Sequence, residues 1–135
     1  MGSRWSQVVV DALDPVRLAH WWAEVLGYQV LAEKPDEVII SAGPGHYPEL
    51  CFLAVPDPKD GKNRLHFDLT PEDQDAEVER LLDMGARHVD IGQGRSVNWV
   101  VLADPEGNEF CVLPASGGAP TAGPRASDIS AAGEP

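Results

Sequence analysis

The sequence is poor in cysteine and in basic residues, and it has no long apolar run. Its two cysteines, Cys51 and Cys111, do not form a CxxC pair, so free buried thiols are expected rather than a disulfide framework. Ten Lys and Arg residues against 22 Asp and Glu residues give a formal charge of −12, which argues against binding nucleic acid or an anionic membrane surface. Without a stretch of about 18 apolar residues or an apolar signal core, the sequence predicts a soluble, cytoplasmic protein.

Two segments of the chain repeat one pattern. Glu49–Leu53 and Glu109–Leu113 both read Glu, apolar, Cys, apolar, Leu, so the two cysteines occupy matched positions. The repeat has a period of about 60 residues, which is too long for a solenoid unit, and the neighbouring elements recur in the same order. The length of 135 residues and the hydrophobic content of 43% suit one globular domain. The sequence therefore predicts a duplicated half-domain.

Each half carries one helix with recognisable ends. Asp14 and Pro15 suit the N-cap and first position of the first helix, and Gly27 suits its C-terminal turn. In the second half, Thr70 is expected to cap a helix that Gly85 ends. Alternating or β-rich runs predict strands around these helices, over 7–11, 28–32, 37–42, 49–53, 64–69, 88–91, 97–102 and 109–113.

These elements predict an α+β fold of two tandem βαβββ modules, over roughly 6–55 and 63–114. One face of each sheet lies under a helix and the other is uncovered, so the two modules are expected to form a curved mixed sheet around a cavity. The domain is expected to cover 1–115. Residues 116–135 are rich in Gly, Ala, Ser and Pro and predict a disordered tail.

Three motifs carry a family resemblance: Leu26–Gly27 after a tryptophan-bearing helix, the run Lys62–Asp68, and the turn Asp104–Asn108. Together with the duplicated βαβββ plan, they are similar to the vicinal oxygen chelate superfamily, and within it to the glyoxalase-like branch that includes bleomycin-resistance-type proteins. The resemblance implies the glyoxalase/bleomycin resistance/dioxygenase fold. It also implies a small-molecule site built from the first and last strands of each half.

Metal-dependent enzymes of this superfamily take their ion ligands from the first and last strands of each half. The resemblance implies that the corresponding positions in this sequence are Gln7, Cys51, His66 and Cys111. Thiols stand here where those enzymes generally offer carboxylates, and this exchange favours soft ions such as Zn²⁺ over hard octahedral ions. Glu49 and Glu109 share the cysteines' face but lie two residues, or about 6.6 Å, along the strand, too far to bind the same ion. We therefore expect no bound metal and no other cofactor, with zinc as the alternative.

The resemblance and the strand faces together give a set of candidate site residues. His66 and Glu109 are expected to move protons on the ligand, and five further side chains are expected to bind it: Gln7, Glu49, Cys51, Trp99 and Cys111. Asp68 shares a face with His66, so His66 is either a functional group or a satisfied structural histidine. Trp99 is a stacking platform for an aromatic ligand if its face points inward, and core under a helix if it points outward.

Two classes of function fit these features. The first is a metal-independent lyase or isomerase that acts on a small carbonyl-bearing molecule. The second is a non-catalytic protein that binds an aromatic natural product or antibiotic, as in self-resistance. The missing carboxylate ligands disfavour a metal-dependent dioxygenase. We expect a homodimer, because strand edges are left uncovered and proteins of the family commonly pair their halves across subunits. The expected partner is a small-molecule ligand, with no nucleic-acid or membrane partner.

Overall fold

The computed structural model describes residues 2–89 and 98–115. The chain divides into two compact units, Met1–Pro58 and Lys59–Pro135. The predicted tail over 116–135 lies outside the described residues. Neither helix in the described part of the chain has the length and apolar character needed to cross a bilayer.

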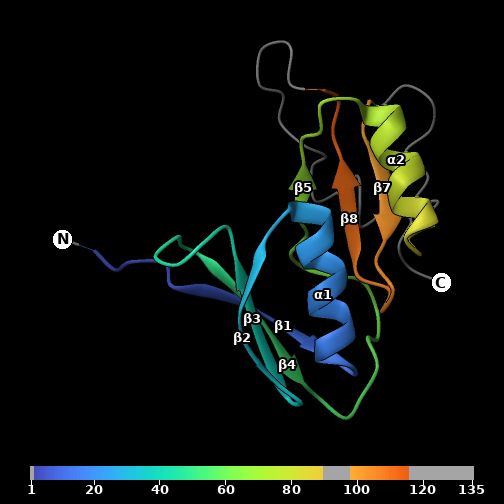
Figure 1. The fold of residues 1–135 in the computed structure, drawn as a ribbon. Helices are drawn as coiled ribbons and strands as arrows, with labels where there is room; N and C mark the ends of the chain where they lie inside the picture. Colours follow the sequence, from blue (N-terminus) through green and yellow to red (C-terminus); the bar gives the residue numbers. More distant parts are fainter. Residues whose placement is uncertain (1, 90–97, 116–135) are drawn as a thin grey trace. The chain divides into compact units, whose positions relative to one another are not determined.

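The first unit contains one helix and four strands (Figure 1). In chain order these are β1 (Gln7–Ala12), α1 (Pro15–Leu26), β2 (Gln29–Lys34), β3 (Glu37–Ser41) and β4 (Glu49–Ala54). The strands form one sheet in the order β1-β4-β3-β2, in which β1 runs parallel to β4 and the other pairs are antiparallel. The βαβββ plan predicted for the first half is confirmed.

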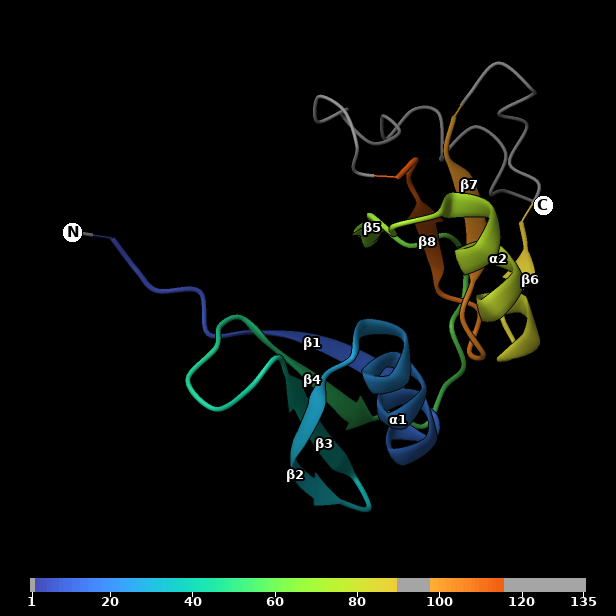
Figure 2. The ribbon, with the colours of Figure 1, turned by 45° about the horizontal axis from the view of Figure 1, so that its top comes forward.

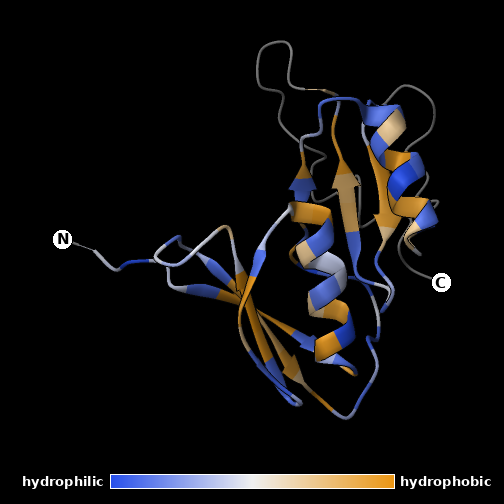
Figure 3. Ribbon diagram, in the orientation of Figure 1, coloured by the Kyte–Doolittle hydropathy of each residue, from blue (hydrophilic) through white to orange (hydrophobic). Residues whose placement is uncertain are grey.

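The ends of α1 are those that the sequence predicts. The Asp14 carboxylate accepts a hydrogen bond from the Arg17 backbone N–H at 3.1 Å, and Gly27 takes a φ of +68° after the last turn. The helix is amphipathic, with apolar and polar segments alternating along it in Figure 3. Trp22 is 1% exposed and meets Trp21 edge to face, with ring centroids 5.1 Å apart. Both tryptophans therefore belong to the core of the first unit.

The two faces of the first sheet differ in what covers them. Val38 on β3 and Phe52 on β4 have no exposed surface and lie on the face that packs against α1. Cys51 precedes Phe52 and so points to the opposite face, together with its paired neighbour Val9. The helix therefore covers one face, and Cys51 lies on the other.

The second unit repeats this plan (Figures 1 and 2). Its elements are β5 (Asp68–Leu69), α2 (Gln74–Asp83), β6 (Arg87–His88), β7 (Val100–Ala103) and β8 (Glu109–Val112). The strand order is β5-β8-β7-β6, with β5 parallel to β8 and the other pairs antiparallel. In both views α2 lies along β7 and β8. The predicted α+β fold of two βαβββ modules is confirmed.

The repeat extends to the register of the strands. Val9 is paired with Cys51 in the first sheet, and Asp68 is paired with Cys111 in the second. In both pairs the cysteine lies on the last strand of its unit, and its partner lies on the first strand, which runs parallel to it. The cysteines therefore occupy the same place in both sheets, as the repeated sequence pattern predicts.

Two predicted boundaries in the second unit are wrong. The strand predicted over 64–69 is reduced to Asp68–Leu69, because β5 is an edge strand and the segment before it is held by the Glu109 carboxylate, which binds the Asn63 N–H. Thr70 does not cap α2. The helix starts after Asp73, whose carboxylate accepts a hydrogen bond from the Ala76 backbone N–H at 3.0 Å. Aspartate is a better N-cap than threonine, so the later cap prevails.

The other boundaries of the second unit agree with the sequence to within a few residues. The strand predicted over 88–91 is observed as Arg87–His88, and the one predicted over 97–102 as Val100–Ala103. Residues 90–91 and 97 of these predictions lie outside the described residues. Gly85, which follows the C-cap residue Met84 of α2, has a φ of +110°, as expected for a glycine that ends a helix.

Candidate functional site

Cys111 lies at the centre of the second sheet, on β8 between β5 and β7. Its Cα is paired with Asp68 on one side and with Val101 on the other. Cys111 and Val101 are each 1% exposed and form a small apolar cluster, against which three half-buried side chains pack: Val89, Trp99 and Leu113. Within the described part of the chain, no side chain of α2 joins this cluster. We call the face that carries it the helix-free face of the second sheet.

Three polar side chains meet beside this cluster. His66 Nε2 lies 3.1 Å from Asp68 Oδ1, and the Asp68 carboxylate lies close enough to the Cys111 thiol to raise its pKa. One nitrogen, oxygen or sulfur atom from each residue lies within 4.8 Å of the other two. We call His66, Asp68 and Cys111 the triad. Two of its members are predicted site residues, and Asp68 joins them.

The Cys111 thiol is held in its neutral form. Burial, followed by the negative charge and hydrogen bond of Asp68, raises the pKa of Cys111 from 9.0 to about 12, against an opposing effect of Lys62. Near neutral pH the thiol therefore keeps its proton. A thiol in this state is not a nucleophile.

Trp99 packs on the helix-free face, against Cys111 and Val101. The sequence did not decide which face of the sheet the Trp99 side chain occupies, and in the structure it lies on the face opposite α2. Among the buried side-chain nitrogen and oxygen atoms of the described residues, Trp99 Nε1 is the one with no hydrogen-bond partner. An indole N–H can only donate, and a buried one usually finds an acceptor. This donor therefore lacks the acceptor that a buried indole N–H usually has.

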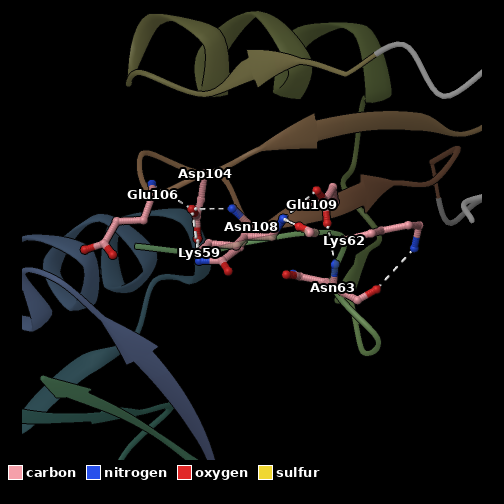
Figure 4. A network of polar contacts seen from close by, with 8 residues as sticks. Lys59, Lys62, Asn63, Asp104, Glu106, Asn108 and Glu109 are labelled. Carbon is pink, nitrogen blue, oxygen red and sulfur yellow. Dashed lines mark hydrogen bonds and ion pairs between the residues drawn. The ribbon is translucent and has the colours of Figure 1, made fainter. Parts of the chain in front are cut away.

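Glu109 anchors the segment that leads to His66 (Figure 4). Its Oε2 lies 2.9 Å from Lys59 Nζ, and its Oε1 accepts a hydrogen bond from the Asn63 backbone N–H at 2.9 Å. The Glu109 side chain is only 12% exposed. Both carboxylate oxygens are therefore engaged by protein groups. A role for Glu109 in proton transfer stays a prediction.

Replacing Glu109 by alanine is expected to lower the free energy of unfolding by about 2 kcal/mol, because the Asn63 N–H and the Lys59 ammonium both lose a charged acceptor. Glu109→Gln is expected to cost less, since its amide oxygen still accepts from Asn63. Urea unfolding followed by circular dichroism measures both variants. An alanine variant as stable as the parent protein would show that the anchor contributes nothing to stability.

The remaining predicted site residues lie in the first unit. Gln7 on β1 and Glu49 on β4 are paired Cα to Cα, and Cys51 lies two residues farther along β4 on the same face. The Cys51 thiol donates a weak hydrogen bond to a Glu37 oxygen at 3.9 Å, and burial, with Glu37 second, raises its pKa. Val9 stands here where Asp68 stands in the second sheet. Within the described ranges, no group like the triad forms around Cys51.

Sequence reasoning missed the parts played by three side chains. Alternation along 64–69 puts Asp68 on the face of His66, but its pairing with Cys111 depends on strand register, which no local pattern reveals. Lys59 reaches Glu109 across 50 residues of sequence, and Glu37 reaches Cys51 across 14. Such long-range contacts leave no signal in composition or spacing.

The triad is the donor set that the structure brings together within one unit. Imidazole nitrogen, carboxylate oxygen and thiolate sulfur are all ligands that Zn²⁺ accepts, and the thiolate disfavours Mg²⁺ and Ca²⁺. Gln7 and Cys51, the other ligand positions implied by the resemblance, belong to the first unit. The residues of the second unit therefore fit a soft divalent ion.

Three solved structures illustrate what the chain is similar to. A glyoxalase/bleomycin resistance/dioxygenase family enzyme from Burkholderia phytofirmans PsJN is 21% identical, over 79% of this chain and 94% of that one, with a TM-score of 0.61. The trypanothione-dependent glyoxalase I of Leishmania major is 19% identical, over 84% and 87%, with a TM-score of 0.62. TnmS3, an antibiotic-binding protein from Streptomyces sp. CB03234, is 20% identical, over 84% and 97%, with a TM-score of 0.58.

The sequence itself also matches a known family. No curated protein sequence matches the chain. At identities near 20%, the three structures establish a shared fold and leave function open. The family of glyoxalase-like domains matches residues 7–113, which span both βαβββ modules. This chain therefore belongs to the glyoxalase-like domain family.

Proposed function

We propose that this protein binds a small organic molecule with an aromatic body and an oxygen-bearing group, such as a carbonyl, on the helix-free face of the second sheet. The observation that carries the proposal is the Trp99 indole N–H, a buried donor without an acceptor beside an apolar cluster. A ligand with a flat apolar part and an acceptor oxygen meets both needs. The antibiotic-binding protein TnmS3, which shares the fold, makes this ligand class reasonable.

Each side chain of the face has a distinct part in this proposal. The half-buried Trp99 ring and Leu113 offer apolar surface to the body of the ligand, and the buried Val101 and Cys111 support them. The Trp99 N–H donates to the ligand's oxygen. Asp68 holds His66 through Nε2, which fixes the imidazole and leaves Nδ1 to exchange a proton with the ligand. If a divalent ion is bound by the triad, it supplies Lewis-acid polarisation of that oxygen.

One observation favours a second candidate, a lyase or isomerase. A histidine oriented by a carboxylate is a common general base, and the His66–Asp68 contact of 3.1 Å has that form. The fold is also that of the Leishmania glyoxalase I. Mass spectrometry of the incubated ligand separates the two candidates. If the parent protein changes the mass of the ligand and His66→Ala does not, the protein is a catalyst. If the parent protein leaves the ligand unchanged, it only binds the ligand.

Replacing Trp99 by phenylalanine is expected to weaken binding of aromatic carbonyl compounds about fivefold, because the ring is kept while one hydrogen bond of about 1 kcal/mol is lost. Isothermal calorimetry against a panel of aromatic ketones, quinones and alcohols measures the effect. Trp5→Phe is the matched control, since Trp5 is 66% exposed. Affinities that are equal for the parent protein and Trp99→Phe across the panel would contradict the proposed donor.

Three further expectations from the sequence stay predictions. These are an enclosed cavity around the ligand, a homodimer and a cytoplasmic location. The proposed site needs none of them, because all of its residues lie in the second unit.

A further inference from the structure

The segment Lys59–Asn63 carries two lysines in different electrostatic surroundings. Lys59 is paired with Glu109, and its Nζ lies 2.9 Å from Glu109 Oε2. Lys62 is half-buried, and its Nζ donates to the Asn63 backbone carbonyl, a neutral acceptor, at 3.2 Å (Figure 4). Among the residues that the structure describes, no carboxylate forms an ion pair with Lys62. The 22 acidic residues of the chain therefore leave this cation without a direct countercharge.

The Glu109 anchor holds this segment on the side of the helix-free face. Glu109 and Cys111 are two residues apart on β8, so their side chains share that face of the sheet. Glu109 Oε1 accepts a hydrogen bond from the Asn63 backbone N–H, directly after Lys62, at 2.9 Å. The charge of Lys62 is felt at the centre of the face, because burial and Asp68 raise the pKa of Cys111 and Lys62 opposes them. The cation therefore lies close to the apolar cluster that the proposed function uses.

We infer that the ligand of the proposed function is an aromatic carboxylate, and that Lys62 binds its carboxylate group on the helix-free face. The inference rests on the proposed function, because it names the class of molecule that the same face binds. An ammonium offers three donors and no acceptor, so it binds an anionic oxygen more strongly than the oxygen of a ketone or an alcohol. All the residues that carry the inference lie in the second unit.

The carboxylates of this face are already matched by other groups. Glu109 has the Lys59 ammonium beside it, and Asp68 Oδ1 lies 3.1 Å from His66 Nε2. Neither carboxylate makes an ion pair with Lys62. An incoming carboxylate thus meets a cation that the side chains of the described residues leave unoccupied.

The same charges give the ligand an orientation. Attraction to Lys62 and repulsion from Asp68 place the carboxylate of the ligand at the segment Lys59–Asn63. The aromatic body then lies towards Trp99 and Leu113, the half-buried side chains of the apolar cluster. Charge therefore selects the ligand, and the apolar cluster supplies contact area.

The test compares two aromatic ligands of the same shape and different charge, naphthoate and naphthamide. Isothermal calorimetry on the full chain in chelator measures both affinities. We expect naphthoate to bind at least about tenfold more tightly, since its carboxylate makes a charge-assisted hydrogen bond with Lys62. Raising the ionic strength should narrow this difference and leave the affinity for naphthamide unchanged.

Three variants assign the preference to Lys62. Lys62→Met should remove the preference for naphthoate and leave the affinity for naphthamide within about twofold of the parent value. Lys62→Arg keeps the positive charge and should restore most of the preference. Arg64→Met is the matched control, because it removes one positive charge from an exposed position of the neighbouring chain, and it should weaken naphthoate binding less than about twofold. Circular dichroism confirms that each variant is folded.

Two results would overturn the inference while the proposed function stands. One is a parent protein that binds naphthamide or aromatic ketones and shows no preference for naphthoate. The other is an equal loss of naphthoate affinity in Lys62→Met and Arg64→Met, which indicates a diffuse effect of charge rather than a contact. If the parent protein binds no aromatic compound of either kind, the proposed function fails and the inference fails with it.

Discussion

Alkylation of Cys111 by iodoacetamide at pH 8 should be at least about 50-fold slower in the folded, metal-free protein than in the unfolded chain. The reactive species is the thiolate. With a pKa of about 12 instead of 9.0, its population at pH 8 falls about a thousandfold. A more basic thiolate attacks about 20 times faster, which recovers part of that loss. Burial of the sulfur slows the reaction further.

The same reaction reports the part played by Asp68. Its charge and hydrogen bond are the second and third causes of the raised pKa, so Asp68→Asn should lower the Cys111 pKa and speed alkylation. The measurement uses Cys51→Ser protein in chelator, with peptide mass spectrometry to follow Cys111 alone. A folded-state rate equal to the unfolded rate would mean that the sulfur is open to solvent and ionises normally.

The raised pKa also predicts how stability depends on pH. The unfolded chain gives up the Cys111 proton near 9.0, whereas the folded chain keeps it until about 12. The unfolded state is therefore favoured progressively between these values, and the free energy of unfolding falls as the pH rises from about 9 towards 12. Below pH 9 both states hold the proton, and this contribution is fully present.

Asp104→Ala should destabilise the protein by about 3 kcal/mol. Asp104 has no exposed surface, and its Oδ1 accepts hydrogen bonds from the backbone N–H groups of Glu106 at 2.9 Å and Asn108 at 3.0 Å. The Asn108 side-chain amide donates to its Oδ2 at 2.9 Å. The turn is closed by the Gly107 N–H, which donates to the Asp104 carbonyl at 2.8 Å. Alanine leaves several partly buried donors without an acceptor.

Urea unfolding measures this loss, and an unchanged m-value would confirm that the unfolded states are comparable. Asp104→Asn should give a smaller loss, since its amide oxygen serves the two backbone donors while its NH₂ faces the Asn108 amide. Asp57→Ala, at an exposed aspartate in the connection before the second unit, is the control and should change stability by less than about 0.5 kcal/mol. A loss below about 1 kcal/mol for Asp104→Ala would mean that the donors find other acceptors.

The features that sequence reasoning placed correctly are those with local causes. Asp14 and Gly27 bound α1 because capping depends on neighbours in sequence. The turn at Asp104–Asn108 follows from proline and glycine at fixed places, and Gly107 takes the positive φ, +88°, that the motif requires. The repeated Glu-x-Cys-x-Leu pattern predicted a duplicated half-domain, and the two sheets have the same strand order. The family resemblance rests on these same segments.

The errors arise where neighbouring caps or distant segments compete. Thr70 and Asp73 both qualify as helix caps by sequence, and the stronger capping preference of aspartate selects the second. Alternation over 64–69 suggests a full strand, yet the Glu109 carboxylate holds Asn63 and shortens it. For the site, the alternation of side chains along each strand does not tell whether Asp68 or Glu109 is the neighbour of Cys111. Register decides this, because Asp68 is paired directly with Cys111.

The order of strands has a consequence for synthesis on the ribosome. In each sheet the last strand of the unit to be made, β4 or β8, takes the central place between strands made earlier. Until it emerges, the edge of β3 or β7 that it will cover is unpaired, and the first strand has no neighbour at all. Neither half can therefore settle gradually from its N-terminus. Each must wait for its closing segment and then complete its sheet in a single late event.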